Sequence, residues 1–120
     1  MYDSLKLLKL LKLLKLLYLE NCPYSIALKE YLDNNKLIYN TEMIKYKEKD
    51  KCKEKYNINT FPQLYFIINN KEINIGGYDN SIELLDKIKN INVDNMKEIY
   101  LSIKEKFTYR EFLLLCCYIL

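Results

Sequence analysis

Glycine and proline are scarce in this sequence, which holds two of each among its 120 residues. Collagen-like helices, proline-rich linkers and turn-dense all-β barrels need many more of these residues, so such folds are excluded. Half of the residues are apolar and 29% are charged, a composition that predicts a folded chain rather than a disordered one. One domain is expected at this length, with each glycine and proline where the backbone requires it.

Apolar periodicity along the chain predicts strands and helices in alternation. A strand, a helix and a second strand form a βαβ unit with parallel pairing, and a hairpin adds antiparallel strands to the same sheet. The expected fold class is therefore α/β, with a four-stranded mixed sheet flanked by helices on both faces. The expected elements are strands at 13–19, 37–44, 62–68 and 72–75, helices from Pro23 to Asn34–Asn35 and at 79–90, a solvated helix or loop at 45–56, and a hairpin turn at 69–71.

The two ends of the chain differ from its middle, and three segments are expected. Residues 1–12 form a low-complexity N-terminal segment, residues 13–90 the main domain, and residues 91–120 a helical C-terminal extension. Lysine recurs at every third position near the N-terminus, which is interpreted as a short helix that passes into the first strand; a membrane-surface helix is the alternative. In the extension, an amphipathic helix is expected before the apolar tail FLLLCCYIL. Three alternative roles are predicted for this tail: covering the sheet edge, forming a dimer or contacting a membrane.

The residue types limit the chemistry. The sequence has no histidine, which excludes histidine zinc ligands, Ser–His–Asp triads and Cys–His dyads. Its four cysteines form no CxxC pair, so it contains neither a zinc ribbon nor a dithiol motif, and no metal site is expected. Without a recognisable secretory signal, a reducing, cytoplasmic location is expected. The net charge of +3 is too small to indicate a nucleic-acid partner.

Cys22 is the main candidate for a reactive group. The segment Cys22-Pro23-Tyr24-Ser25 places a thiol at a helix start, because proline is favoured at the first helical position. Unpaired N–H groups and the positive end of the helix dipole stabilise a thiolate there, and the thiolate is the nucleophilic form. The Ser25 hydroxyl can add a hydrogen bond, and Tyr24 is the other residue predicted to support the thiolate. The alternative is a buried structural cysteine that precedes a proline.

Two further segments carry weaker signals. Pro62 opens a core strand, where it interrupts no hydrogen-bond ladder, and a cis Phe61–Pro62 bond would leave the backbone of Phe61 free to pair with an extended peptide. Gly76–Gly77 precedes a helix whose first N–H groups, at Tyr78 and Asp79, can bind a carboxylate. Alone, each segment is better explained as an ordinary strand entry or strand-to-helix turn.

Together the three segments, CPYS at 22–25, TFPQLYF at 60–66 and IGGYD at 75–79, resemble the glutaredoxin family in motif and order. The resemblance covers roughly residues 13–90 and implies a thioredoxin-like fold and glutathione-dependent thiol–disulfide exchange. It implies that Cys22 is the attacking thiol, that glutathione is the co-substrate and that glutathionylated proteins are the partners. The residues that it implies for glutathione binding are Tyr24, Phe61, cis-Pro62, Gly77, Tyr78, Asp79 and Asn80.

The sequence departs from the family in three places. Ser25 replaces the second cysteine of dithiol members, so a monothiol route is expected, in which Cys22 attacks a glutathionyl sulfur and a second glutathione resolves the product. Leu19 and Asn59 occupy positions that are usually basic in the family. Weak glutathione binding, or a different thiol partner, is therefore expected unless a nearby lysine substitutes; the candidates are Lys51, Lys53 and Lys55.

Alternative functions remain open at this stage. An iron–sulfur carrier would use Cys22 and glutathione thiols across a dimer, although Pro-Tyr stands where such carriers in the family have Gly-Phe. An interaction module that has kept the fold and lost the activity would explain the missing basic residues and the extension. Glutathione S-transferases share the fold but need a helical second domain that the extension is too short to supply. Cys52 would be a resolving or regulatory thiol if exposed, whereas Cys116 and Cys117 are expected to serve in packing or membrane contact.

Overall fold

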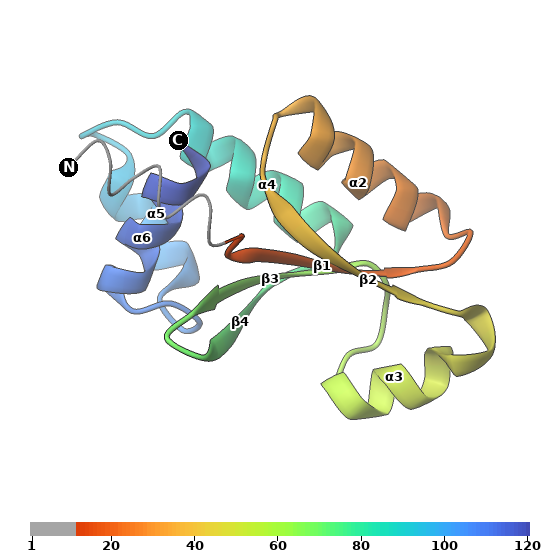
Figure 1. Ribbon diagram of the computed structural model, residues 1–120. Helices are drawn as coiled ribbons and strands as arrows, with labels where there is room; N and C mark the ends of the chain where they lie inside the picture. The colour runs from red at the N-terminus through yellow and green to blue at the C-terminus, as the bar shows by residue number, and fades with distance from the viewer. Residues whose placement is uncertain (1–11) are drawn as a thin grey trace.

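The computed structural model describes residues 12–120, which form a four-stranded mixed sheet covered by helices (Figure 1). The strands run in the order β2-β1-β3-β4. Strands β1 and β2 are parallel, and β3 is antiparallel to both β1 and β4. The strand bounds are β1 Leu14–Leu19, β2 Tyr39–Ile44, β3 Gln63–Ile68 and β4 Lys71–Gly76.

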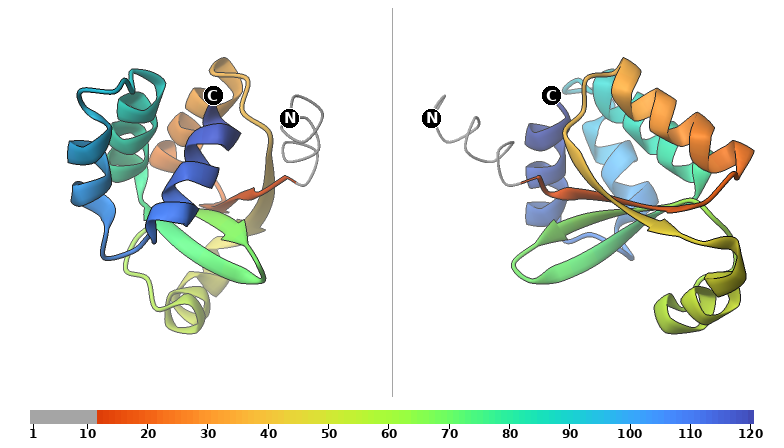
Figure 2. Two further views of the ribbon diagram at one scale, coloured as in Figure 1. Left: turned by 90° about the vertical axis from the view of Figure 1, so that its left-hand side faces the viewer. Right: turned by 45° about the vertical axis from the view of Figure 1, so that its right-hand side comes forward.

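Helices lie on both faces of this sheet. One face is covered by α2 (Pro23–Asn34), α4 (Tyr78–Lys89) and α6 (Tyr109–Ile119), and α5 (Met96–Ile103) packs beside α4 and α6 (Figures 1 and 2). On the opposite face lies α3 (Lys49–Tyr56), preceded by the short 3-10 turn η1 (Tyr46–Glu48). The arrangement confirms the predicted fold class.

Alternation along β1 divides its side chains between two cores. Leu14 and Leu16 are fully buried in the large core under α2, α4 and α6, whereas Leu17 belongs to a smaller core under α3. Lys15 lies on the α3 face, where its Nζ pairs with Glu42 Oε1 at 3.2 Å and Glu72 Oε2 at 3.3 Å. These carboxylates explain how a lysine is accommodated in a central strand.

Most predicted elements are confirmed, with changes at their ends. The first strand, the helix from Pro23 and the hairpin at Asn69–Asn70 lie where the pattern places them. The second strand begins two residues later than predicted, at Tyr39. The expected N-terminal helix lies outside the described residues, and the division into three segments stays a prediction. Between residues 12 and 120, no helix is long and apolar enough to cross a membrane.

The C-terminal extension forms two helices that pack on the sheet. Its aromatic side chains enter the large core, where the ring of Phe107 lies 6.4 Å and that of Tyr118 6.1 Å from the ring of Phe66 on β3. The Tyr118 hydroxyl also donates to the Ile38 carbonyl oxygen at 2.5 Å. The apolar tail forms most of helix α6. Most of its large side chains are buried against the sheet face that α2 and α4 also cover.

Candidate active site

The strand register brings the three motif segments together at one end of the strands. Leu17 of β1 pairs with Gln63, so the end of β1 lies beside the start of β3. Leu64 pairs with Gly76, so the end of β4 lies there as well. CPYS begins three residues after β1, and the other two motifs overlap the start of β3 and the end of β4, so the three segments converge.

Cys22 occupies the N-cap position of α2 and is partly exposed. Asn21 adopts a left-handed conformation with φ of 58°, which turns the chain from β1 into the helix, and the Cys22 N–H donates to the Leu19 carbonyl at 3.2 Å. Pro23 follows at the first helical position, and no side chain caps the helix. The N–H groups of the first turn are therefore available to a thiolate on Cys22.

Ser25 is fully buried in the first turn of α2. Its Oγ accepts a hydrogen bond from the Leu19 N–H at 3.1 Å, which ties the end of β1 to the start of the helix. In the described part of the chain, no side-chain hydrogen bond joins Ser25 to Cys22. The support of a thiolate by Ser25 and Tyr24 stays a prediction.

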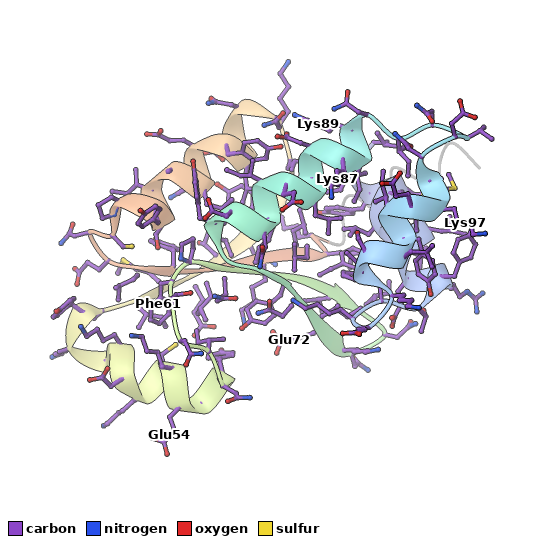
Figure 3. The ribbon with its side chains drawn as sticks, turned by 180° about the vertical axis from the view of Figure 1, so that it is seen from behind. Glu54, Phe61, Glu72, Lys87, Lys89 and Lys97 are labelled. Carbon is purple, nitrogen blue, oxygen red and sulfur yellow. The ribbon has the colours of Figure 1, made fainter. Side chains whose placement is uncertain are left out.

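The Phe61–Pro62 peptide bond is cis, as the resemblance implies. The Phe61 side chain is buried between α3 and the sheet (Figure 3). Gln63 holds the preceding loop in place, because its Nε2 donates to the Thr60 carbonyl at 3.1 Å and its Oε1 accepts from Asn74 Nδ2 at 3.0 Å. The proline segment is thus fixed from both sides.

The backbone constrains the two glycines differently. A Cβ atom on Gly77 would lie 3.4 Å from the Pro62 carbonyl oxygen, which is an ordinary contact distance, so Gly77 packs beside the cis-proline but is not required there. Gly76 has a φ of 128°, and a Cβ atom there would lie 2.7 Å from Cβ of Asn80. Gly77 is also the N-cap of α4 and provides no side-chain cap, which leaves the first N–H groups of that helix available to an anion.

A groove of about 520 Å³ runs across these segments. Tyr24 from α2 and Tyr78 from α4 both line it, and their ring centroids lie 5.7 Å apart. Cys22 and Pro62 are not among the lining residues: Cys22 lies two residues before Tyr24, and Pro62 follows Phe61. The other predicted residues that line the groove are Phe61, Gly77, Asp79 and Asn80.

Comparison with known proteins agrees with this geometry. The glutaredoxin family model matches residues 9–73, which is more than half of the chain. The chain belongs to the glutaredoxin family. A solved structure of glutaredoxin 1 from Francisella tularensis, complexed with cacodylate, is 25% identical and superposes with a TM-score of 0.52 over 65% of this chain and 96% of that one. No curated protein matches the sequence.

This glutaredoxin lacks the two basic residues at the positions that are usual in the family. Leu19 is partly buried and packs against the smaller core, and Asn59 is exposed. The lysines of α3 do not line the groove; Lys51 and Lys55 line a separate cavity beside Glu42. Among the described residues the groove is instead lined by one cation, Lys106. Sequence reasoning missed this residue, because no motif in the extension indicates where its turn lies.

The other cysteines lie in different surroundings. Cys52 is buried in the smaller core, where desolvation and, to a lesser extent, Glu42 raise the pKa of its thiol. The expectation of an activated Cys52 thiolate required exposure, and that condition is not met. Burial raises the pKa of the Cys116 thiol to about 11, whereas Cys117 is exposed. Within residues 12–120, no three His, Cys, Asp or Glu side chains are grouped so as to hold a metal ion.

Proposed function

We propose that this glutaredoxin is a glutathione-dependent thiol–disulfide oxidoreductase that removes glutathione from glutathionylated proteins in the cytoplasm through Cys22 alone. The observation that carries the proposal is a partly exposed thiol at an uncapped helix start, two residues before Tyr24, which lines a groove together with Phe61 and a second uncapped helix start. These features supply a nucleophile and a peptide-binding surface in one place.

Glutathione would lie extended along the groove. Its backbone would pair with the N–H and C=O of Phe61, and the carboxylate of its γ-glutamyl end would accept hydrogen bonds from the N–H groups of Tyr78 and Asp79. Tyr24 would form one wall. This placement would direct the glutathionyl sulfur toward the start of α2, where Cys22 lies two residues before Tyr24.

The reaction then proceeds in two exchanges. The Cys22 thiolate attacks the glutathionyl sulfur of the mixed disulfide; a Cys22–glutathione disulfide forms, and the protein substrate leaves as a thiolate that takes a proton from water. A second glutathione thiolate attacks the glutathione sulfur of this intermediate, which releases oxidised glutathione and restores the Cys22 thiolate. A monothiol route is supported by Ser25 at the position of a second cysteine and by the burial of Cys52.

The proposal is tested by the reduction of a glutathionylated model disulfide, coupled to glutathione reductase. We expect Cys22→Ser to reduce the rate to that of the uncatalysed reaction, and Ser25→Ala, Cys52→Ala and Cys117→Ser to remain active. Loss of activity in Cys52→Ala with the fold retained would contradict the monothiol route. An inactive wild type would contradict the proposal and favour the interaction module that the missing basic residues suggest.

A further inference from the structure

Lys106 is brought to the groove by the C-terminal extension. It lies in the turn between α5 and α6, where its N–H and that of Phe107 donate to the Ile103 carbonyl at 3.0 and 3.1 Å. Phe107 is almost fully buried against Phe66 of β3. Because the next residue is fixed in the core, the turn holds Lys106 beside Asn80 at the start of α4, and both line the groove.

The charged side chains that line the groove are Asp79 and Lys106. Neither forms an ion pair within 4 Å in the described part of the chain, with each other or with another residue. Glu83 and Glu105 share a neighbouring cavity with Lys106, but Glu83 is paired with Lys87 at 3.1 Å. The groove therefore carries one cation and one anion that are both available to a ligand.

We propose that Lys106 is a specificity-determining residue that binds the carboxylate of the γ-glutamyl end of glutathione. This assignment rests on the proposed function. A free α-amino acid end carries one carboxylate and one ammonium, so it matches the two unpaired charges of the groove and the open N–H groups of α4. The extension thus supplies a cation to a chain that has Leu19 and Asn59 where basic residues are usual in the family.

The test compares two symmetric disulfides, oxidised glutathione and the disulfide of Cys-Gly, which lacks the γ-glutamyl group. The second-order rate at which each modifies reduced Cys22 is measured by quench and intact mass, for the wild type and for Lys106→Gln, Lys106→Arg and Lys104→Gln. Lys104 lies two residues earlier, is exposed and does not line the groove, so it controls for net charge.

We expect Lys106→Gln to slow the reaction with oxidised glutathione about three- to fivefold, as for a solvent-accessible ion pair, and to leave the reaction with the Cys-Gly disulfide unchanged. Lys106→Arg and Lys104→Gln should both react at the wild-type rate. An unchanged Lys106→Gln, or an equal loss with both disulfides, would overturn the assignment of Lys106 and leave the proposed function intact. A wild type whose Cys22 reacts with neither disulfide would overturn both.

Discussion

At the scale of single residues, the four cysteines show how position decides reactivity. Cys22 and Cys117 are accessible to solvent, and Cys52 and Cys116 are buried in different cores. Burial disfavours the thiolate because its charge loses hydration, and the pKa values of both buried thiols are raised accordingly. Only Cys22 combines exposure with a helix N-terminus.

We predict that alkylation of the folded protein distinguishes the four thiols. With iodoacetamide at pH 7.5, Cys22 should react first and Cys117 more slowly, whereas Cys52 and Cys116 should react only after unfolding, because the thiolate is the reacting form and burial suppresses it. Peptide mass spectrometry over a time course gives the four rates. Modification of Cys52 in the native state at the rate of Cys117 would contradict its burial.

The site was predictable where a residue type is demanded by the backbone. Cys22, Pro62 and Gly76 could be found because a helix start, a strand entry and a turn with positive φ each favour one residue type. Lys106 could not be found in this way, since a lysine in an exposed turn is compatible with almost any position. Its role depends on where Phe107 packs, which is a tertiary contact that short-range patterns do not encode.

At the scale of secondary-structure elements, α6 begins with a complete capping box. The Glu111 N–H donates to Thr108 Oγ1 at 3.2 Å, and the Thr108 N–H donates to Glu111 Oε1 at 2.8 Å. Glu111 also pairs with Lys71 of the β3–β4 hairpin at 3.1 Å. The Thr108 N–H and then Lys71 hold the pKa of Glu111 below its ordinary value of 4.5. One carboxylate therefore connects the start of α6 to the sheet.

Glu111→Gln should lower the free energy of unfolding by about 0.5 kcal/mol at pH 7, because the amide keeps the capping hydrogen bond and loses the charge. A carboxyl whose pKa is depressed in the folded state stabilises the fold above its unfolded pKa, and this contribution is lost as the pH falls through the folded value. The difference between wild type and variant should thus shrink below about pH 4.5. Urea unfolding from pH 3 to 7 measures it, with exposed Glu30→Gln as the control; a pH-independent difference would contradict the mechanism.

Element types were easier to predict than element ends or faces. Residues 45–56 were expected to form a solvated helix or loop because their sequence is mostly charged, yet Cys52 is buried under the helix that residues 49–56 form. A helix that covers a sheet with a single small residue leaves almost no apolar periodicity in its sequence. Lys15 interrupts the apolar pattern of the first strand, which was nevertheless predicted correctly; the carboxylates that pair with it come from two other strands.

At the scale of the whole molecule, the extension is part of the main core. The family model ends at residue 73, yet Phe107, Phe112, Leu115 and Tyr118 are each no more than 2% exposed, in the core that also contains Leu14 and Phe66. The sequence left this tail open to membrane contact or dimer formation, because an apolar helix has the same pattern whichever apolar surface it meets. Its role became visible only once the sheet face beneath it was known.

We predict that Phe112→Ala lowers the free energy of unfolding by about 3–5 kcal/mol, because it removes a fully buried ring that the surrounding side chains cannot replace. This is a large share of the roughly 5–15 kcal/mol that stabilises a typical domain, so Phe112→Leu, with a loss of about 1 kcal/mol, serves where the alanine variant does not fold. Leu101→Ala on α5 is the matched control, since Leu101 is half exposed and should cost about 0.5 kcal/mol or less. Urea midpoints compare the three variants with the wild type. If the Phe112 variants were as stable as the Leu101 variant, α6 would be an appendage of the fold, and the position of Lys106 over the groove would lose its support.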